Sequence, residues 1–237
     1  MVLRLLILLL VFVMVPGPWV IAKAHAASES KRVPHTERAG LLILGDSISA
    51  AYGIDKSLGW VALLESQLHR QCPYVSVHNA SVSGETTAGG LMRLPDLLRR
   101  WQPAVVVIEL GGNDGLRGLS PAQMQHNLQE IIRLARKAGA EPLVLGILIP
   151  PNYGKAYRRL FDEAIADAAT AEGVARLDFF LTGVADHEAL MQADGLHPTA
   201  AAQPQLLANA WQILEKPLER ICGNVDLSLD DIEQATR

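Results

Sequence analysis

Apolar and polar positions follow one another along this chain in blocks that predict five strands, each followed by a helix. Short apolar or alternating runs predict strands at Gly40–Gly45, Tyr74–Asn79, Ala104–Leu110, Pro142–Ile149 and Val174–Asp178. Apolar stripes of helical spacing predict helices at Trp60–Gln71, Thr87–Trp101, Pro121–Ala138, Lys155–Glu172 and Thr199–Arg220. This order predicts one α/β domain, a parallel sheet with right-handed crossovers and helices on both faces.

Capping residues and prolines refine the ends of these elements. We expect Ser120 to cap the third helix, with Pro121 in its first turn, and Thr199 to cap the last helix. A bend is expected at Pro95, and a bend or a restart at Pro204. Phe179–Gln192 is expected to be irregular and partly helical, and the segment 226–237 to fray.

The first 26 residues resemble a secretory signal. Arg4 precedes an apolar run, Leu5–Val15, which is too short to span a bilayer comfortably, and Ala24-His25-Ala26 has the small-x-small pattern of a cleavage site. An uncleaved anchor is the alternative, but Pro16, Gly17 and Pro18 interrupt it. We therefore expect a signal peptide at 1–26, a flexible linker at 27–39, an α/β domain at 40–221 and an acidic tail at 222–237. The cleaved protein would be periplasmic or secreted, without a stable membrane anchor.

Two cysteines, Cys72 and Cys222, each follow a predicted helix. In an oxidising compartment such a pair can form a disulfide, and the first and last helices of a doubly wound sheet often share a face. We predict a Cys72–Cys222 bond as a hypothesis, with two free thiols as its alternative. The spacing of the cysteines does not match a metal site.

Composition and charge narrow the classes of function. Hydrophobic residues make up 49% of the chain, which indicates a globular fold and not a disordered one. The formal net charge is −4, and no long basic run occurs, so nucleic acid is not expected as a partner. We expect a monomer that acts on a small molecule.

Polar, glycine-rich segments follow the predicted strands, on the side where α/β folds bind ligands. Ser47 follows the first strand, Gly84 the second, Asn113 the third, and Asp194 and His197 the fifth. Taken one at a time, these residues favour ordinary roles in caps and turns. Together they provide what an acyl-transfer site needs.

A serine hydroxyl becomes a good nucleophile only when a base takes its proton, and imidazole titrates near neutrality. Ser47 is therefore the candidate nucleophile and His197 the candidate base. Asp194, three residues before His197, can accept a hydrogen bond from Nδ1 and fix the tautomer. The backbone N–H groups of Ser47 and Gly84 and the amide of Asn113 are candidate donors for the oxyanion.

Four segments resemble the sequence blocks of the SGNH, or GDSL-type, hydrolases, in the same order and with matching spacing. They are Gly45-Asp46-Ser47, Ser83-Gly84-Glu85-Thr86, Gly111-Gly112-Asn113-Asp114 and Asp194-Gly195-Leu196-His197-Pro198. Within that family the chain looks most like a group of bacterial exported thioesterases that also act as proteases and lysophospholipases. Ile48 replaces the leucine of the family's name. The cysteine pair and the acidic tail lie outside the family pattern.

The resemblance implies a three-layer α/β/α, flavodoxin-like sandwich with strand order 2-1-3-4-5. It implies a triad of Ser47, Asp194 and His197, an oxyanion hole of Ser47, Gly84 and Asn113, and neither cofactor nor metal. It also implies hydrolysis of fatty acyl thioesters, lysophospholipids and small esters through an acyl-enzyme. A carbohydrate O-acetyl esterase and a non-catalytic lipid carrier remain as alternatives.

Apolar residues near the expected crevice are candidates for holding an acyl chain. They are Leu116, Ile149, Pro150 and Tyr153. Simple anchoring of the loops is the alternative role for these residues. Arg117 would either meet an anionic head group or remain a solvated surface arginine.

Overall fold

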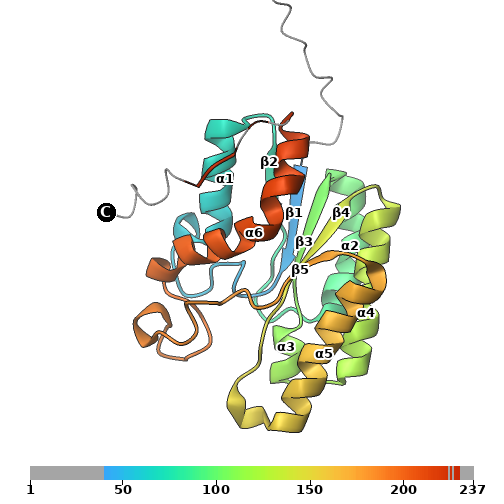
Figure 1. Cartoon of the computed structure of the whole chain (residues 1–237), viewed down its shortest axis with the longest axis vertical. Helices are drawn as coiled ribbons and strands as arrows, with labels where there is room; N and C mark the ends of the chain where they lie inside the picture. Colours follow the sequence, from blue (N-terminus) through green and yellow to red (C-terminus); the bar gives the residue numbers. More distant parts are fainter. Residues whose placement is uncertain (1–39, 224, 226, 230–237) are drawn as a thin grey trace, which may run out of the picture. The chain divides into compact units, whose positions relative to one another are not determined.

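The strands form one parallel sheet with the predicted order. The computed structural model describes residues 40–223, 225 and 227–229. Its strands are β1 (Gly40–Gly45), β2 (Ser76–Asn79), β3 (Val105–Glu109), β4 (Glu141–Leu145) and β5 (Ala175–Leu177). They lie side by side in the order β2-β1-β3-β4-β5 (Figure 1). The expected five-stranded flavodoxin-like sheet is therefore confirmed.

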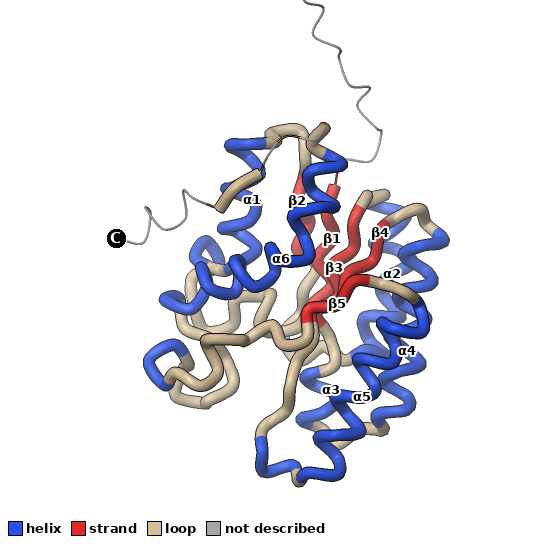
Figure 2. The backbone as a smooth tube through the Cα atoms, viewed as in Figure 1, coloured by secondary structure: helices blue, strands red, loops and turns tan. Residues whose placement is uncertain are grey.

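Helices cover both faces of this sheet (Figure 2). On one face α1 packs against α6, and on the other α4 packs between α2 and α5. The bounds are Trp60–Gln71 (α1), Thr87–Trp101 (α2), Pro121–Lys137 (α4), Lys155–Glu172 (α5) and Gln203–Ile221 (α6), with a short α3 at Gly112–Leu116. No helix among the described residues has the length and hydropathy needed to cross a bilayer.

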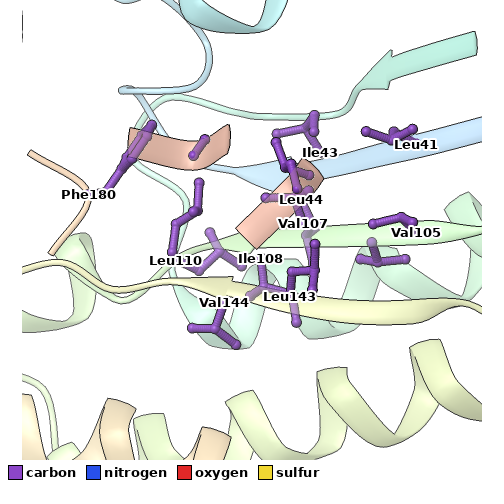
Figure 3. Packing of buried hydrophobic residues seen from close by; sticks show 14 of the residues in the cluster. Leu41, Ile43, Leu44, Val105, Val107, Ile108, Leu110, Leu143, Val144 and Phe180 are labelled. Carbon is purple, nitrogen blue, oxygen red and sulfur yellow. The ribbon is translucent and has the colours of Figure 1, made fainter. Parts of the chain in front are cut away.

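The core is centred on β1 and β3, which are covered on both faces. Leu41–Leu44 and Val106–Ile108 have no exposed surface. Figure 3 shows their side chains packed among those of neighbouring strands, including Leu143 and Val144 of β4. Burial of each leucine, isoleucine or valine side chain stabilises the fold by about 1.5–3 kcal/mol relative to an exposed one. This core therefore holds the carboxyl ends of β1 and β3 in fixed positions relative to each other.

Four strands are shorter than predicted; β3 and β5 each lack one predicted residue at either end, and the larger differences are in β2 and β4. β2 begins at Ser76 and not at Tyr74, and β4 ends at Leu145 although the apolar run continues to Ile149. β4 pairs with β3 only as far as Ile108↔Val144 and with β5 only as far as Leu145↔Leu177. Gly146 still exchanges backbone hydrogen bonds with Leu177 and Phe180, both 2.8 Å, and beyond it no described strand pairs with the chain, so the residues after Gly146 leave the sheet.

The ends of two helices test the predicted caps. Ser120 accepts a hydrogen bond from the N–H of Gln123 and caps α4 as expected. Thr199 makes no side-chain cap; it precedes a short 3₁₀ turn, Ala200–Ala202, and its hydroxyl is buried without a partner among the described residues. α6 begins afresh at Gln203 with Pro204 in its first turn, which agrees with the predicted restart.

A disulfide joins the carboxyl ends of α1 and α6. Cys72 and Cys222 are both buried, and their Cα atoms are 5.8 Å apart. Both ends lie at the edge of the sheet where β1 begins, opposite the carboxyl ends of the strands (Figure 1). The bond therefore fastens the two helices of one face to each other.

The segments expected to be a signal peptide (1–26) and a linker (27–39) lie outside the described residues. The expectation that the chain frays from residue 226 is wrong for Leu227–Leu229. Leu227 is buried, and the carbonyl of Ser228 accepts hydrogen bonds from the side chains of Gln67 and Gln71 on α1. This contact places residues 227–229 against the domain, because an apolar side chain and a backbone acceptor both find partners there.

Candidate active site

Ser47 lies in a tight turn at the carboxyl end of β1. The N–H of Ala50 donates to the carbonyl of Asp46 (3.0 Å) and that of Tyr52 to the carbonyl of Ser47 (3.0 Å). A side chain at Gly45 would place its Cβ 2.8 Å from Cβ of Ser49 and from Oγ of Ser81. The turn therefore requires a glycine at this position, and it leaves Ser47 partly exposed above a buried strand.

The structure brings Ser47, His197 and Asp194 into one hydrogen-bonded chain. Nε2 of His197 lies 2.9 Å from Oγ of Ser47, and Nδ1 of His197 lies 2.6 Å from Oδ2 of Asp194. An ionised carboxylate can only accept, so the hydrogen of the neutral imidazole lies on Nδ1 and Nε2 remains a free base. That base faces the hydroxyl whose proton it would take.

The turn around Asp194 favours the ionised carboxylate. Oδ1 of Asp194 accepts hydrogen bonds from the backbone N–H groups of Leu196 (2.9 Å) and His197 (3.0 Å). The hydrogen bond from the His197 ring, followed by these backbone bonds, lowers the pKa of Asp194 to about 2. Asp194 therefore stays negative at every pH at which a neutral imidazole is available.

Two further residues hold the histidine turn, and sequence reasoning missed both. The carbonyl of His197 accepts a 2.7 Å bond from the N–H of Gln192, whose side-chain amide donates to the carbonyls of Tyr52 (2.8 Å) and Pro198 (3.0 Å). The rings of Tyr52 and His197 are tilted to each other, with their centroids 4.6 Å apart. These contacts join segments about 140 residues apart, and no local pattern marks them.

Asn113 and Gly84 carry two of the three candidate donors to an oxyanion. Nδ2 of Asn113 donates one hydrogen to Oδ2 of Asp46 (3.0 Å), which leaves the second hydrogen of the amide free. Within the described residues, the N–H groups of Ser47 and Gly84 donate to no other group. Ser47 and Asn113 line the same cavity, whereas Gly84 is not among the residues that line it.

Arg117 connects two of these loops. Its guanidinium donates a 2.7 Å hydrogen bond to the carbonyl of Gly84, so it is an exposed arginine with a backbone partner and not a freely solvated one. The same carbonyl belongs to a glycine with φ of +80°, a conformation that side chains other than glycine rarely adopt. Arg117, which follows the carboxyl end of α3, thus fastens the loop of Gly84 to the short helix whose first turn contains Asn113.

Asp114 makes a second, buried connection between the same loops. It accepts bonds from the N–H (2.9 Å) and the hydroxyl (2.6 Å) of Thr87, at the start of α2. The Thr87 hydroxyl also accepts from Nδ2 of Asn127 on α4 (3.0 Å). Burial raises the pKa of Asp114, while the bonds from Thr87 favour its ionised form. Sequence reasoning treated this residue as part of a turn.

A cavity of about 510 Å³ opens beside Ser47, Asn113 and His197. Most of its wall is apolar and includes Leu116, Ile147, Leu148, Ile149, Pro150, Phe179, Leu181 and Met191. Leu116, Ile149 and Pro150 therefore line it as expected. Tyr153 does not; its hydroxyl donates a 2.8 Å hydrogen bond to the carbonyl of Leu116, which does line the cavity.

Comparison with known proteins agrees with this geometry. Residues 43–203 match the GDSL-like Lipase/Acylhydrolase family. The chain is 55% identical to Esterase TesA of Pseudomonas aeruginosa over 75% of this chain and 88% of that protein. It is 45% identical to the Thioesterase 1/protease 1/lysophospholipase L1 of Escherichia coli K12, over 69% of this chain and 77% of that one.

Among solved structures, a crystal structure of TesA superposes with a TM-score of 0.73 at 54% identity, covering 76% of this chain and 99% of that chain. The family match, the strand order and the arrangement of Ser47, His197 and Asp194 therefore agree. The chain belongs to the GDSL-like lipase/acylhydrolase family and is an ester hydrolase.

Proposed function

We propose that this enzyme is an exported serine esterase that hydrolyses acyl esters and thioesters through an acyl-enzyme intermediate. The chain of contacts from Ser47 through His197 to Asp194, at 2.9 and 2.6 Å, is the observation that carries the proposal. The apolar cavity beside Ser47 supports acyl groups as the substrate class.

In the first step, Oγ of Ser47 attacks the acyl carbonyl carbon while Nε2 of His197 takes the hydroxyl proton. The carbonyl oxygen becomes an oxyanion that accepts hydrogen bonds from the N–H groups of Ser47 and Gly84 and from the amide of Asn113. When the intermediate collapses, the bond to the leaving oxygen or sulfur breaks, and that atom receives the proton from the imidazolium. The acyl group remains on Ser47.

The second step repeats this sequence with water as the nucleophile. Nε2 of His197 takes a proton from water, whose oxygen attacks the acyl carbon of the ester on Ser47. Collapse of the second tetrahedral intermediate returns the proton to Oγ of Ser47 and releases a carboxylic acid. Asp194 stays ionised throughout and stabilises the imidazolium that forms in each step.

Cavity size favours medium or long acyl chains over acetate. A volume of about 510 Å³ with a mainly apolar wall exceeds what an acetyl group needs. A carbohydrate O-acetyl esterase would gain little from Ile149, Leu181 and Met191 around the acyl site. The proposed substrates are therefore fatty acyl thioesters, lysophospholipids and related esters.

The test is hydrolysis of p-nitrophenyl esters from acetate to palmitate by the cleaved protein and by a Ser47→Ala variant. Ser57→Ala, which alters an exposed serine on the 3₁₀ turn Lys56–Leu58, is the matched control. We expect activity that peaks at medium or long chains and is lost only in Ser47→Ala. Activity retained in Ser47→Ala would refute the serine mechanism, and activity confined to acetate would assign the enzyme to the O-acetyl esterases.

Export rests on two independent features. Residues 1–26 have the pattern of a signal peptide, and the Cys72–Cys222 bond is of the kind that persists in oxidising compartments.

Because a single chain supplies Ser47, His197 and Asp194, we also expect the cleaved protein to work as a monomer. Amino-terminal sequencing should identify Ala27 as the first residue, and light scattering should give the mass of one chain. A retained amino terminus would contradict export with cleavage.

A further inference from the structure

Two acidic side chains that take no part in the triad lie buried beneath the candidate active site. Asp46 is 3% exposed and Glu109 is 1% exposed. The register of β1 and β3 pairs Gly45 with Glu109, which places Asp46 beside the end of β3. No lysine or arginine among the described residues forms a salt bridge with either carboxyl. A pair of buried acids without a cation requires an explanation.

The two carboxyl oxygens of Glu109 differ in their hydrogen bonds. Oε2 accepts from the backbone N–H of Asp46 (3.3 Å) and from the hydroxyl of Ser49 (2.8 Å). The indole N–H of Trp60 donates to Oγ of Ser49 (3.1 Å), so the hydroxyl proton of Ser49 is directed to Glu109. Oε1 is buried, and no described residue donates to it. An anionic oxygen in this position would be costly, whereas a protonated one can donate.

The carboxylate of Asp46 is the neighbouring group that can accept a hydrogen bond from a protonated Glu109. The two side chains stand side by side, because Glu109 pairs with Gly45 in the sheet and accepts from the backbone N–H of Asp46, and a hydrogen bond from Glu109 lowers the pKa of Asp46. Such a bond between two carboxyl groups requires a proton on one of them. Oδ1 of Asp46 accepts from the N–H of Ile48 (3.0 Å) and Oδ2 from the amide of Asn113 (3.0 Å). Both oxygens of Asp46 thus have donors; burial raises the pKa of Asp46, and its hydrogen bonds and the charge of His197 oppose that rise. Burial, and next the Asp46 charge, raise the pKa of Glu109 well above its usual range, so the proton belongs on Glu109.

We propose that Glu109 is a positioning residue of the oxyanion hole, whose protonated carboxyl donates to Asp46 so that the Asp46 carboxylate can orient the Asn113 amide. This role rests on the function proposed above. With one N–H of Asn113 held by Asp46, the other is left for the oxyanion. A flipped amide would instead turn its carbonyl oxygen toward the Asp46 carboxylate, so the wrong orientation is excluded. A neutral Glu109 also keeps a second negative charge away from the developing oxyanion.

Two substitutions separate this role from simple packing. In Glu109→Gln the amide carbonyl can accept from Asp46 and Ser49 while its NH₂ donates to the Asp46 carboxylate, so kcat should stay close to that of the wild type. Glu109→Met keeps the volume and removes the donor, so kcat should fall about ten- to a hundredfold with little change in KM. The matched control is Gln67→Met, because Gln67 is equally buried but lies on α1, away from the site.

Protonation itself is measured without turnover. The infrared difference spectrum between the wild type and Glu109→Gln at neutral pH should contain the band of a protonated carboxyl group. The same band is expected in Ser47→Ala, so a failure of the proposed serine mechanism would leave this result intact. The pH profiles of kcat for the wild type and Glu109→Gln should coincide, because Asp46 and His197, the titratable neighbours of this group, are present in both.

The band, together with an active Glu109→Gln and an impaired Glu109→Met, would support the proposal. An absent band would overturn it, as would a Glu109→Gln variant that loses as much kcat as Glu109→Met. Wild-type kcat in Glu109→Met would also overturn it. If Glu109→Met does not fold, the infrared band and the activity of Glu109→Gln still decide the question.

Discussion

Oδ2 of Asp194 and Nδ1 of His197 are 2.6 Å apart, and the two residues belong to a single turn in which Asp194 also accepts two backbone hydrogen bonds. One carboxylate therefore shapes the turn and orients the imidazole. The pairing predicts that the two effects can be separated, since an amide keeps the shape of the carboxylate but carries no charge.

Asp194→Asn should lower kcat roughly 10⁴-fold, because a neutral amide neither fixes the productive tautomer of His197 nor stabilises the imidazolium. Steady-state kinetics on a p-nitrophenyl ester, with Asp167→Asn on the exposed face of α5 as control, would measure this. Because the pKa of Asp194 is about 2, its own titration should not contribute to any loss of activity above about pH 4. A kcat near that of the wild type would exclude Asp194 from the triad.

Asn113→Ala should lower kcat about 10²- to 10³-fold and leave KM little changed, since the lost hydrogen bond forms mainly in the transition state. Asn113→Asp should lower kcat further than Asn113→Ala does. A carboxylate cannot donate a hydrogen bond, and it would face the carboxylate of Asp46, to which Asn113 donates at 3.0 Å in the wild type. The comparison of kcat for these two variants checks the prediction. If the aspartate variant were the more active one, donation by this side chain would be disproved.

Arg117→Met should lower kcat roughly tenfold, because loss of a charged hydrogen bond frees the carbonyl of Gly84 and loosens the loop that carries one donor. The free energy of unfolding should change by no more than about 0.5 kcal/mol, since Arg117 is exposed. Arg99→Met, which removes an exposed arginine on α2, provides the control in kinetics and in urea unfolding. Equal kcat values for the two variants would contradict a role for Arg117 in holding the loop.

The double variant Cys72→Ala/Cys222→Ala should lose about 2–5 kcal/mol of unfolding free energy, because the bond closes a loop between residues separated by 150 positions. Its kcat at moderate temperature should not change, since the bond lies at the end of the sheet opposite the active site (Figure 1). Urea unfolding and ester hydrolysis measure the two quantities. An unchanged unfolding midpoint, or a loss of kcat in the folded protein, would contradict this separation.

Glu109→Gln should become more stable relative to the wild type as the pH rises. The pKa of Glu109 is raised above 4.5, so its contribution to stability is fully present below pH 4.5 and is lost as the pH rises toward its value in the folded protein. The difference in unfolding free energy should therefore grow by about 1.4 kcal/mol per pH unit above pH 4.5, until the pH reaches the raised pKa of Glu109 in the folded protein. Asp46 and His197 are the titratable neighbours in both proteins. Parallel stability curves would show that Glu109 is ionised in the folded state.

Local patterns were enough for much of the fold. The bounds of β1 and α5 were predicted to the residue, because the signals that end them are local. A short apolar run stops at Gly45, and a helical stripe stops at Gly173. The end of β4 was not, because an apolar run carries no information about where its partners stop. The cap by Thr199 failed for a similar reason, since the chain there first makes a separate turn.

By itself, the sequence determined the order of strands and helices and the types of side chain that follow each strand. Those features depend on neighbours along the chain, as with Ser47 after β1 or His197 three residues after Asp194. Only the tertiary structure decided which groups meet, such as Arg117 with Gly84, Tyr153 with Leu116 and Glu109 with Asp46. A charged residue at the end of an apolar strand was the one local sign of Glu109. Its partner comes from another strand, because the β1–β3 register is set by burial of the whole core.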